Sequence, residues 1–229
     1  MTNLISLRNV SKDYGSSVKA LDSVTLGIDK GEFVFIVGPS GAGKSTLIKL
    51  LYREEVPSDG QVVVLGKDMA KIRRREIPFL RRRIGVVFQD FKLLEDKTIG
   101  ENISFALEVT GAPTREIKKR VTQVLNLVGL KDRKDAYPNE LSGGEQQRIA
   151  IARALVRNPD ILLADEPSGN LDPKTSHEIF SLLERANMYG TTVVVATHAQ
   201  DMVNLLKKRV IELRNGTLIR DERRGAYSS

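Results

Sequence analysis

The stretch GPSGAGKST, Gly38 to Thr46, has residue types and a spacing suited to holding phosphate. A glycine, four residues and Gly-Lys-Ser stand between an apolar run, FVFIV, and a helical run, STLIKLL. Glycines let backbone N–H groups surround phosphate oxygens, with Lys44 reaching the β- and γ-phosphates and Ser45 reaching Mg²⁺. A glycine-rich turn without a ligand is the disfavoured alternative. The expected nucleotide contacts are Gly38, Pro39, Ser40, Gly41, Ala42, Gly43, Lys44, Ser45 and Thr46.

Two adjacent carboxylates, Asp165 and Glu166, end the apolar run ILLADEP. Neighbouring residues that leave a strand point in different directions. Asp165 can therefore face a phosphate-bound Mg²⁺ while Glu166 faces the attacking water as general base or orienting group. The alternative is that these acids cap a helix beginning in SGNLDPKT.

A second segment suited to anions is LSGGEQQ, Leu141 to Gln147, which leads into the helical pattern EQQRIAIARALV. A helix N-terminus offers backbone N–H donors and the positive end of the helix dipole, and Ser142 adds a hydroxyl. The chain thus carries two candidate phosphate-binding segments far apart in sequence.

The elements that position these residues follow from hydrophobic patterning. Short β-branched runs without alternation are typical of strands buried on both faces of a parallel sheet. We therefore predict an α/β fold. The runs are FVFIVG at Phe33, QVVVLG at Gln61, IGVVF at Ile84, DILLADE at Asp160, TTVVVATH at Thr191 and VIEL at Val210.

Helical spacing replaces strand patterning from Asp90 to about Arg157, which predicts a mostly helical insertion. In TREIKKRVTQVLNLVGL one face is apolar, and Gly129 stands where the helix is expected to stop. The residues on that face are Ile117, Val121, Val124, Leu125 and Val128.

The composition of the chain limits the classes of protein to which it can belong. The 229 residues include no cysteine, which excludes disulfides and thiolate metal sites, and the net charge is +7. No signal-like N-terminus or membrane-spanning apolar run is visible, so we expect a soluble cytoplasmic chain. The basic run from Lys71 to Gly85 is interpreted as a solvated face rather than a nucleic-acid site, because aromatic residues do not interleave with it. The tail RDERRGAYSS is expected to be frayed.

The segment LSGGEQQ resembles the signature motif of ATP-binding-cassette ATPases, and the other cassette motifs occur in order along essentially the whole chain. The resemblance implies a P-loop NTPase cassette over residues 1–229, built from a nucleotide-binding α/β core, 1–89 and 158–229, and a helical subdomain, 90–157, with the signature. It also implies a mainly parallel core sheet and an N-terminal antiparallel β portion. The motifs are Tyr14, the phosphate loop, Gln89, LSGGEQQ, ILLADEP, SGNLD and His198.

The resemblance implies roles at matching positions. Tyr14 would stack on adenine, unless it only packs at an edge, and His198 would bond the γ-phosphate, unless it is a core histidine. Gln89 would meet Mg²⁺ and water. The implied catalytic residues are Lys44, Gln89, Glu166 and His198, and the implied metal ligands are Ser45, Gln89 and Asp165.

The signature implies a head-to-tail homodimer that closes around two ATP molecules. In such a dimer the signature of one copy covers the γ-phosphate bound by the other, and Asp172 of SGNLD lies across the seam. The signature contacts implied are Ser142, Gly143, Gly144 and Glu145.

A single cassette without a membrane segment is typical of a subunit that drives a separate membrane protein. VVFQDFKLLEDKTIGENISFAL and DEPSGNLD resemble the family of lipoprotein-releasing, macrolide-exporting and FtsE-type cell-division ATPases, and QDFKLL favours the last group. That group implies an integral FtsX-like partner and control of cell-wall hydrolases. It also implies a peripheral position on the cytoplasmic face of the membrane at the division site, with membrane contact through the partner and no nucleic acid.

Alternatives remain. An exporter or lipoprotein-extracting ATPase comes second and a DNA- or ribosome-acting cassette third, whereas Glu166 and His198 disfavour a scaffold that does not hydrolyse ATP. After Gln89, the apolar residues Phe91, Leu93 and Leu94 are interpreted as a groove for a short partner helix, or else as core of the insertion. The basic residues from Arg73 to Arg83 are a second surface for a partner or for anionic headgroups.

Overall fold

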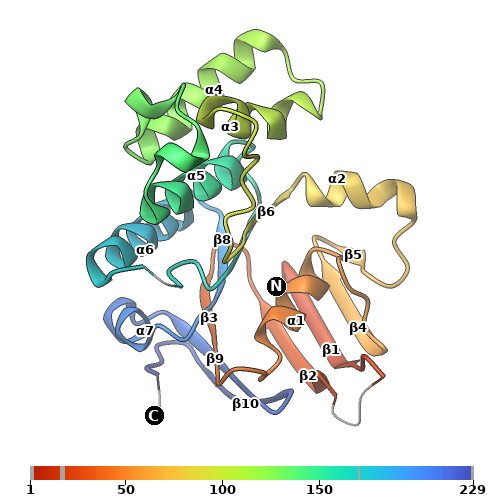
Figure 1. Ribbon diagram of the computed structural model, residues 1–229. Helices are drawn as coiled ribbons and strands as arrows, with labels where there is room; N and C mark the ends of the chain where they lie inside the picture. Colours follow the sequence, from red (N-terminus) through yellow and green to blue (C-terminus); the bar gives the residue numbers. More distant parts are fainter. Residues whose placement is uncertain (1–2, 16–18, 170, 228–229) are drawn as a thin grey trace.

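The computed structural model describes residues 3–15, 19–169 and 171–227, so Asn170 of the SGNLD motif lies outside the described residues. Two sheets form the body of the molecule, and an arm of helices rises from one side (Figure 1). No helix in the described ranges is long and apolar enough to cross a membrane.

The larger sheet has the strand order β10-β9-β3-β8-β7-β6. Five of its strands run parallel, and β10 runs antiparallel to β9, which confirms the α/β class and the mainly parallel core. The strands are β3 (Phe33–Val37), β6 (Ile84–Val87), β7 (Ile161–Asp165), β8 (Thr192–Ala196), β9 (Arg209–Arg214) and β10 (Thr217–Glu222). In the register of this sheet, Ala196 of β8 pairs with both Ile36 of β3 and Asp165 of β7. The chain therefore leaves three neighbouring strands at one edge.

The smaller sheet is antiparallel, with the order β2-β1-β4-β5. Its strands are β1 (Ile5–Lys12), β2 (Leu21–Ile28), β4 (Asp59–Val64) and β5 (Lys67–Asp68). The expectation that QVVVLG joins the parallel sheet is wrong, because it forms β4 and pairs antiparallel with β1. Only Val62 and Val64 of this strand are buried, so it needs cover on one face alone.

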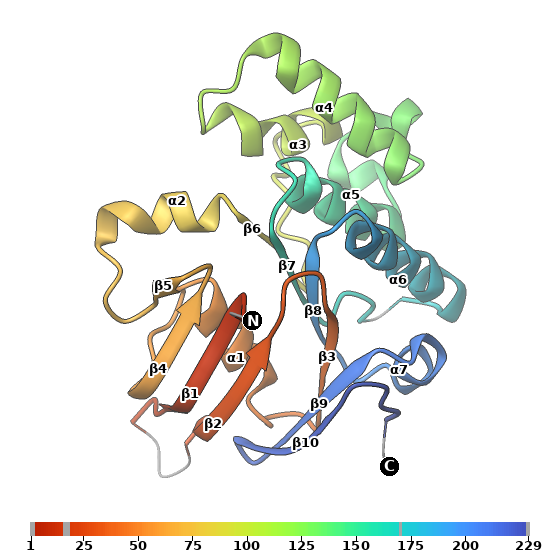
Figure 2. The same cartoon turned by 180° about the vertical axis from the view of Figure 1, so that it is seen from behind.

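Helix α1 (Lys44–Leu51) lies between the two sheets and joins them. Its apolar side chains share one core with residues of both sheets, including Ile5 and Val62 of the small sheet and Ile36 of the large one. On the other face of the large sheet, α6 (Pro173–Met188) and α7 (Gln200–Leu206) cover a second core that contains Phe35 and Phe180 (Figure 2).

The helical arm contains α3 (Ile99–Glu108), α4 (Thr114–Leu127) and α5 (Gly143–Leu155), together with short 3-10 turns at Lys131–Arg133 and Pro138–Glu140. The arm has a core of its own. The predicted face of α4 is confirmed, since Val121, Val124 and Leu125 are buried, and Gly129 follows the helix at φ 71°. Helix α5 also packs on β6 and α6, which fixes the arm to the large sheet.

The basic run forms a 3-10 turn, Arg74–Glu76, and α2 (Ile77–Arg81), at the side of the small sheet (Figure 1). Part of its charge is structural. Arg81 donates to the backbone carbonyl of Tyr52 at 3.1 Å, and Arg83 pairs with Asp160 at 2.8 Å. The run is therefore only partly a free basic face.

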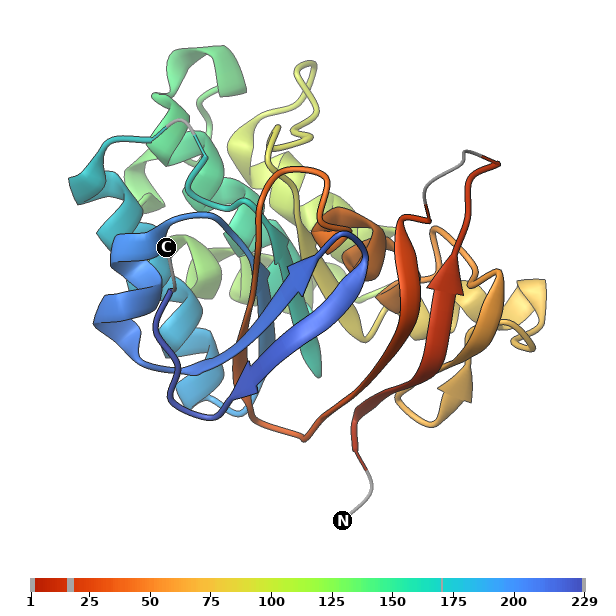
Figure 3. The same cartoon turned by 90° about the horizontal axis from the view of Figure 1, so that it is seen from below.

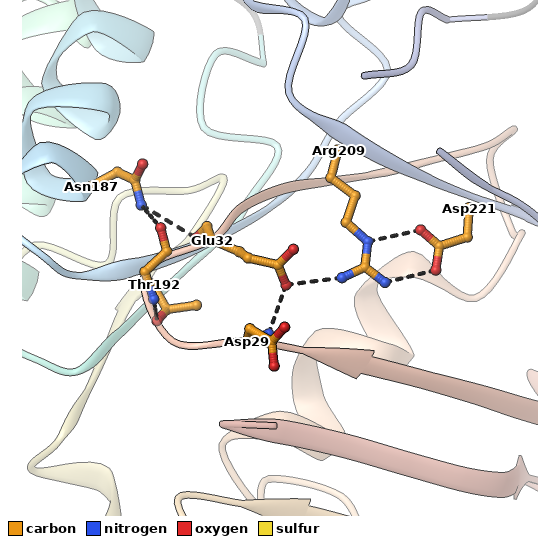
Figure 4. Close-up of polar contacts among 7 residues, drawn as sticks. Asp29, Glu32, Asn187, Thr192, Arg209 and Asp221 are labelled. Atoms are coloured by element: carbon orange, nitrogen blue, oxygen red, sulfur yellow. Dashed lines mark hydrogen bonds and ion pairs between the residues drawn. The ribbon is translucent and has the colours of Figure 1, made fainter. Parts of the chain in front are cut away.

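A polar network anchors the opposite edge of the large sheet (Figure 4). Arg209 of β9 binds both carboxylate oxygens of Asp221 on β10, at 2.8 and 2.7 Å, and Glu32 before β3 at 2.9 Å. Asn187 at the end of α6 donates to the carbonyl of Gly31 at 2.8 Å. The hairpin of β9 and β10 is thereby held beside β3 (Figure 3).

We expect Phe180→Ala to lower the free energy of unfolding by about 3–5 kcal/mol, because it removes a fully buried ring that packs against Phe35. Met188→Ala, at an 83% exposed position of the same helix, should change it by less than about 0.5 kcal/mol. Urea unfolding followed by circular dichroism measures both. Equal effects at the two positions would contradict this description of the core.

Candidate functional site

The phosphate loop joins β3 to α1 and requires glycine at two described positions. Gly38 has φ 141°, and a Cβ there would run into the carbonyl oxygen of Leu213. Gly43, the residue before α1, has φ 102°, and a Cβ there would meet the carbonyl of Ala20. Neither conformation suits an L side chain, so glycine at both positions lets the loop curl tightly against its neighbours.

Lys44 begins α1 and is buried. Its Nζ donates to the carbonyl oxygens of Gly38, at 2.9 Å, and Pro39, at 3.1 Å. The ammonium group is therefore held across the loop by the loop's own backbone. This arrangement concentrates positive charge where the loop's glycines leave backbone exposed for an anion.

The side chains of Ser45 and Asp165 meet although they are far apart in sequence. Ser45 Oγ donates to Asp165 Oδ1 at 3.2 Å. Burial raises the pKa of the Asp165 carboxyl, and the hydrogen bond from Ser45 opposes the rise. A hydroxyl and one carboxylate fit Mg²⁺, which takes few protein ligands and completes its shell with phosphate oxygens and water. Among the described residues no group of three or more His, Cys, Asp and Glu side chains could hold a metal without such help.

Glu166 and His198 form a pair at the ends of β7 and β8. Glu166 adopts φ 48°, and its N–H donates to the carbonyl of Ala196 at 2.8 Å. Its Oε2 accepts from the His198 backbone at 3.2 Å and lies 2.9 Å from His198 Nδ1. The Glu166 side chain is 14% exposed and that of His198 is 69% exposed, so His198 is not a core histidine.

The strand-end acids do not cap the following helix. Asp172 caps α6, accepting from the Thr175 N–H at 3.0 Å. The alternative interpretation of Asp165 and Glu166 as helix caps is therefore wrong, and both carboxylates remain available to the site.

A cavity of about 610 Å³ gathers most of the predicted residues. Pockets of this size hold small ligands of nucleotide dimensions. Gln89, Glu166 and His198 line it together with the whole phosphate loop, and Ala20 and Tyr227 complete its wall. Gln89 also lines a neighbouring groove of about 590 Å³, which connects it to Phe91 and to Gly143 of the signature.

Tyr14, Asp165 and the signature residues do not line this cavity, although Asp165 lines the neighbouring groove with Gln89. Tyr14 is 51% exposed, and one face of its ring is covered by the Lys12 ammonium at 4.7 Å. The signature lies away from the cavity at the start of α5, the helix predicted there. Ser142 Oγ accepts from the Glu145 N–H at 3.3 Å, and the Glu145 carboxylate binds back to the Ser142 N–H at 2.9 Å.

Sequence reasoning missed two features of the site. Ser142 to Glu145 is a capping box, and its S-x-x-E spacing was a readable signal. The backbone and hydroxyl of Ser142 hold the pKa of the Glu145 carboxyl below its usual range. Tyr227 had no signal, because its position depends on how the tail folds back.

A glycine-rich loop between a strand and a helix, with a carboxylate at the end of a neighbouring strand and a helical arm that carries LSGGEQQ at the start of a helix, is the arrangement of an ATP-binding cassette. The family model for ABC transporters matches residues 21–169, and the chain belongs to this family. It is an ATPase that binds ATP.

Its relatives include cell-division proteins. The chain is 56% identical to the cell division ATP-binding protein FtsE of Bacillus subtilis over 226 residues, 99% of each chain. It is 54% identical to FtsE of Mycobacterium tuberculosis over 225 residues, 98% of each chain.

A solved relative has the same fold. The dimeric ATP-binding cassette MJ0796, in a post-hydrolysis state bound to ADP and Pi, superposes with a TM-score of 0.88 at 38% identity. The alignment covers 97% of this chain and 100% of that one.

Variants of the two phosphate-binding segments should separate their functions. Lys44→Ala should weaken ATP binding by roughly 10- to 100-fold, because it removes a charged hydrogen-bond donor. Ser142→Arg should leave ATP binding by the isolated chain within about two-fold, because Ser142 lies outside the cavity, but should abolish hydrolysis. Equilibrium binding of a fluorescent ATP analogue and phosphate release measure the two effects. Equal losses of ATP binding in the two variants would show that the phosphate loop and the signature belong to one site of the same chain.

Proposed function

We propose that the chain is the ATP-hydrolysing subunit of a membrane-bound cell-division complex of the FtsE type. An integral FtsX-like partner would carry its conformational change across the membrane to control cell-wall hydrolysis. The subunit would be peripheral on the cytoplasmic face of the membrane at the division site. The observation that carries the proposal is the near full-length identity to cell-division ATP-binding proteins, joined to a cavity lined by Lys44, Gln89, Glu166 and His198.

The proposed chemistry is in-line attack of water on ATP. Glu166 orients the water and accepts its proton, the water oxygen bonds to the γ-phosphorus, and the bond to the β–γ bridging oxygen breaks to leave ADP and phosphate. Lys44 and His198 hold the γ-phosphate oxygens. Mg²⁺ bound by Ser45, Gln89 and Asp165 would neutralise phosphate charge.

We propose that two copies close head to tail, each supplying its signature to the other's nucleotide. The separation of Ser142 from the cavity of its own chain supports this arrangement, as does the dimeric state of the relative MJ0796. Ser142 Oγ donates to the Glu145 carboxylate at 2.8 Å, so it would have to exchange that partner to bind a phosphate.

The proposed division of the chain is an α/β core of residues 1–89 and 158–229 and a helical subdomain of residues 90–157. Gln89 stands at the boundary and lines both the nucleotide cavity and the adjoining groove. A change in ATP occupancy can thereby alter the groove's shape. We propose this groove and the segment that follows it as the docking surface for the membrane partner.

The apolar residues of that segment differ in their surroundings. Phe91 lines the groove, whereas Leu93 packs against the core of the arm. Leu94 is partly exposed, and its backbone is held by the Asn102 amide in both directions, at 2.7 and 3.0 Å. Leu94 is therefore the position whose side chain can be changed with least effect on the fold.

Glu166→Gln should retain ATP binding, lower turnover by roughly 100- to 10,000-fold and accumulate the closed dimer, because the amide cannot accept the proton. Size-exclusion chromatography with ATP and Mg²⁺, together with phosphate release, measures these effects. Unchanged turnover would show that Glu166 is not the general base.

Leu94→Glu should keep basal ATP binding and abolish co-purification with the membrane partner, because it places a charge in the proposed docking surface. Met188→Glu, at an exposed position on α6, is the matched control and should co-purify normally. Recovery of the partner from detergent extracts is the measurement. Wild-type recovery with Leu94→Glu would move the docking site elsewhere, and the exposed arginines before α2 would be tested next.

A further inference from the structure

The expectation that the C-terminal tail is frayed is wrong for residues 223–227, because hydrogen bonds fix their course. After β10 the chain turns back, and Gly225 N–H donates to the carbonyl of Lys208 at 3.2 Å. Arg220 donates to the carbonyl of Ala226 at 2.6 Å, and the Tyr227 N–H donates to Asn204 Oδ1 of α7 at 2.7 Å.

Packing adds to these anchors. Gly225 is buried, and a Cβ at this position would lie 2.7 Å from the Cβ of Val210 on β9. The tail thus crosses β9 where only a glycine fits without a shift. The hairpin from which it emerges is itself held by the bidentate pair of Arg209 and Asp221 (Figure 4).

The tail delivers the Tyr227 side chain to the nucleotide cavity. The ring is half-buried, packs against the core under α6 and α7, and lines the cavity with Gly38, Glu166 and His198. Burial raises the pKa of the phenol, and the carboxylates of Glu212 and Glu166 add to the rise. The backbone of Gly38 is near enough to the phenol to lower its pKa.

We propose that Tyr227 is a positioning residue of the ATPase site, which holds the first residue of the phosphate loop and closes the cavity wall beside Glu166 and His198. Gly38 connects Tyr227 to Lys44, because it lines the cavity together with Tyr227 and its carbonyl accepts from Lys44 Nζ. The inference rests on the proposed roles of Lys44, Glu166 and His198 in hydrolysis.

The expected effect is on turnover more than on ATP binding. ATP binding is shared among the backbone groups of the whole loop, whereas hydrolysis depends on the placement of Lys44 relative to Glu166. Small displacements of reacting groups lower rates strongly even where binding is preserved. A residue that only stabilised the fold would not produce this separation.

The test compares Tyr227→Phe, which removes the hydroxyl and keeps the ring, with Tyr227→Ala and wild type. Tyr189→Phe, at an 81% exposed tyrosine that directly follows the end of α6, is the matched control. Phosphate release as a function of ATP concentration gives kcat and KM, and thermal unfolding gives Tm. All variants are made in the full chain.

Tyr227→Phe should lower kcat roughly three- to ten-fold, because it removes the proposed polar contact of the phenol with the loop, with KM within about two-fold and Tm unchanged. Tyr227→Ala should lower kcat at least as much, and Tyr189→Phe should match wild type.

Three results would overturn the proposal. A Tyr227→Phe kcat within two-fold of wild type would show that the phenol positions nothing, and a higher kcat would show that the tail obstructs closure. A rise in KM or a fall in Tm that accompanies the fall in kcat would assign Tyr227 a general structural role. Glu166→Gln in the same assay tests the proposed hydrolytic site itself. Wild-type activity of this variant would contradict the proposed site, whatever the result at Tyr227.

Discussion

The parallel register of β3, β8 and β7 is the constraint on which the rest of the molecule depends. Ala196 of β8 pairs with Ile36 on one side and Asp165 on the other, so three strands end level with one another. The carboxyl ends of parallel strands lie at the same edge of the sheet, and the loops that follow the strands converge there. The phosphate loop, the two carboxylates and His198 meet for this reason. Their separation in sequence does not matter once the register is set.

Burial on both faces of the large sheet holds that register. Helix α1 and the small sheet cover one face, and α6 and α7 cover the other. A one-residue slip would exchange the side chains between these two cores, which are filled on both sides. The polar network of Arg209, Glu32 and Asp221 ties the opposite edge, so the site is supported far from its chemistry (Figure 4).

The helical arm is attached to this frame through α5, whose Ile151 and Leu155 belong to the core of the large sheet. Helix α5 packs on β6 and α6, while its N-terminus carries the signature and the capping box of Ser142 and Glu145. The arm also has a core of its own, formed by α3, α4 and the outer face of α5. Gln89 lies where the sheet passes into the arm and faces both the cavity and the groove. A change of nucleotide therefore has a direct physical connection to the surface proposed for the partner.

The sequence by itself determined the local chemistry. The phosphate loop needs only a strand, a glycine-rich turn and a helix in succession, and the acids at the end of ILLADEP need only the strand before them. Helix α4 and its stop at Gly129 follow from periodicity and one glycine. Such features depend on residues close in the chain, whose preferences are readable one segment at a time.

Tertiary structure decided what depends on packing between distant segments. The strand QVVVLG joins the antiparallel sheet because β1 offers it a partner, a choice that its own valines do not specify. Tyr227 reaches Gly38 because the hairpin of β9 and β10 sets the tail's starting point, and Gly225, Asn204 and Arg220 fix its direction. No pattern within RDERRGAYSS encodes that path, since Lys208, Asn204 and Val210, which the tail contacts, lie elsewhere in the chain and come together only when the large sheet has formed.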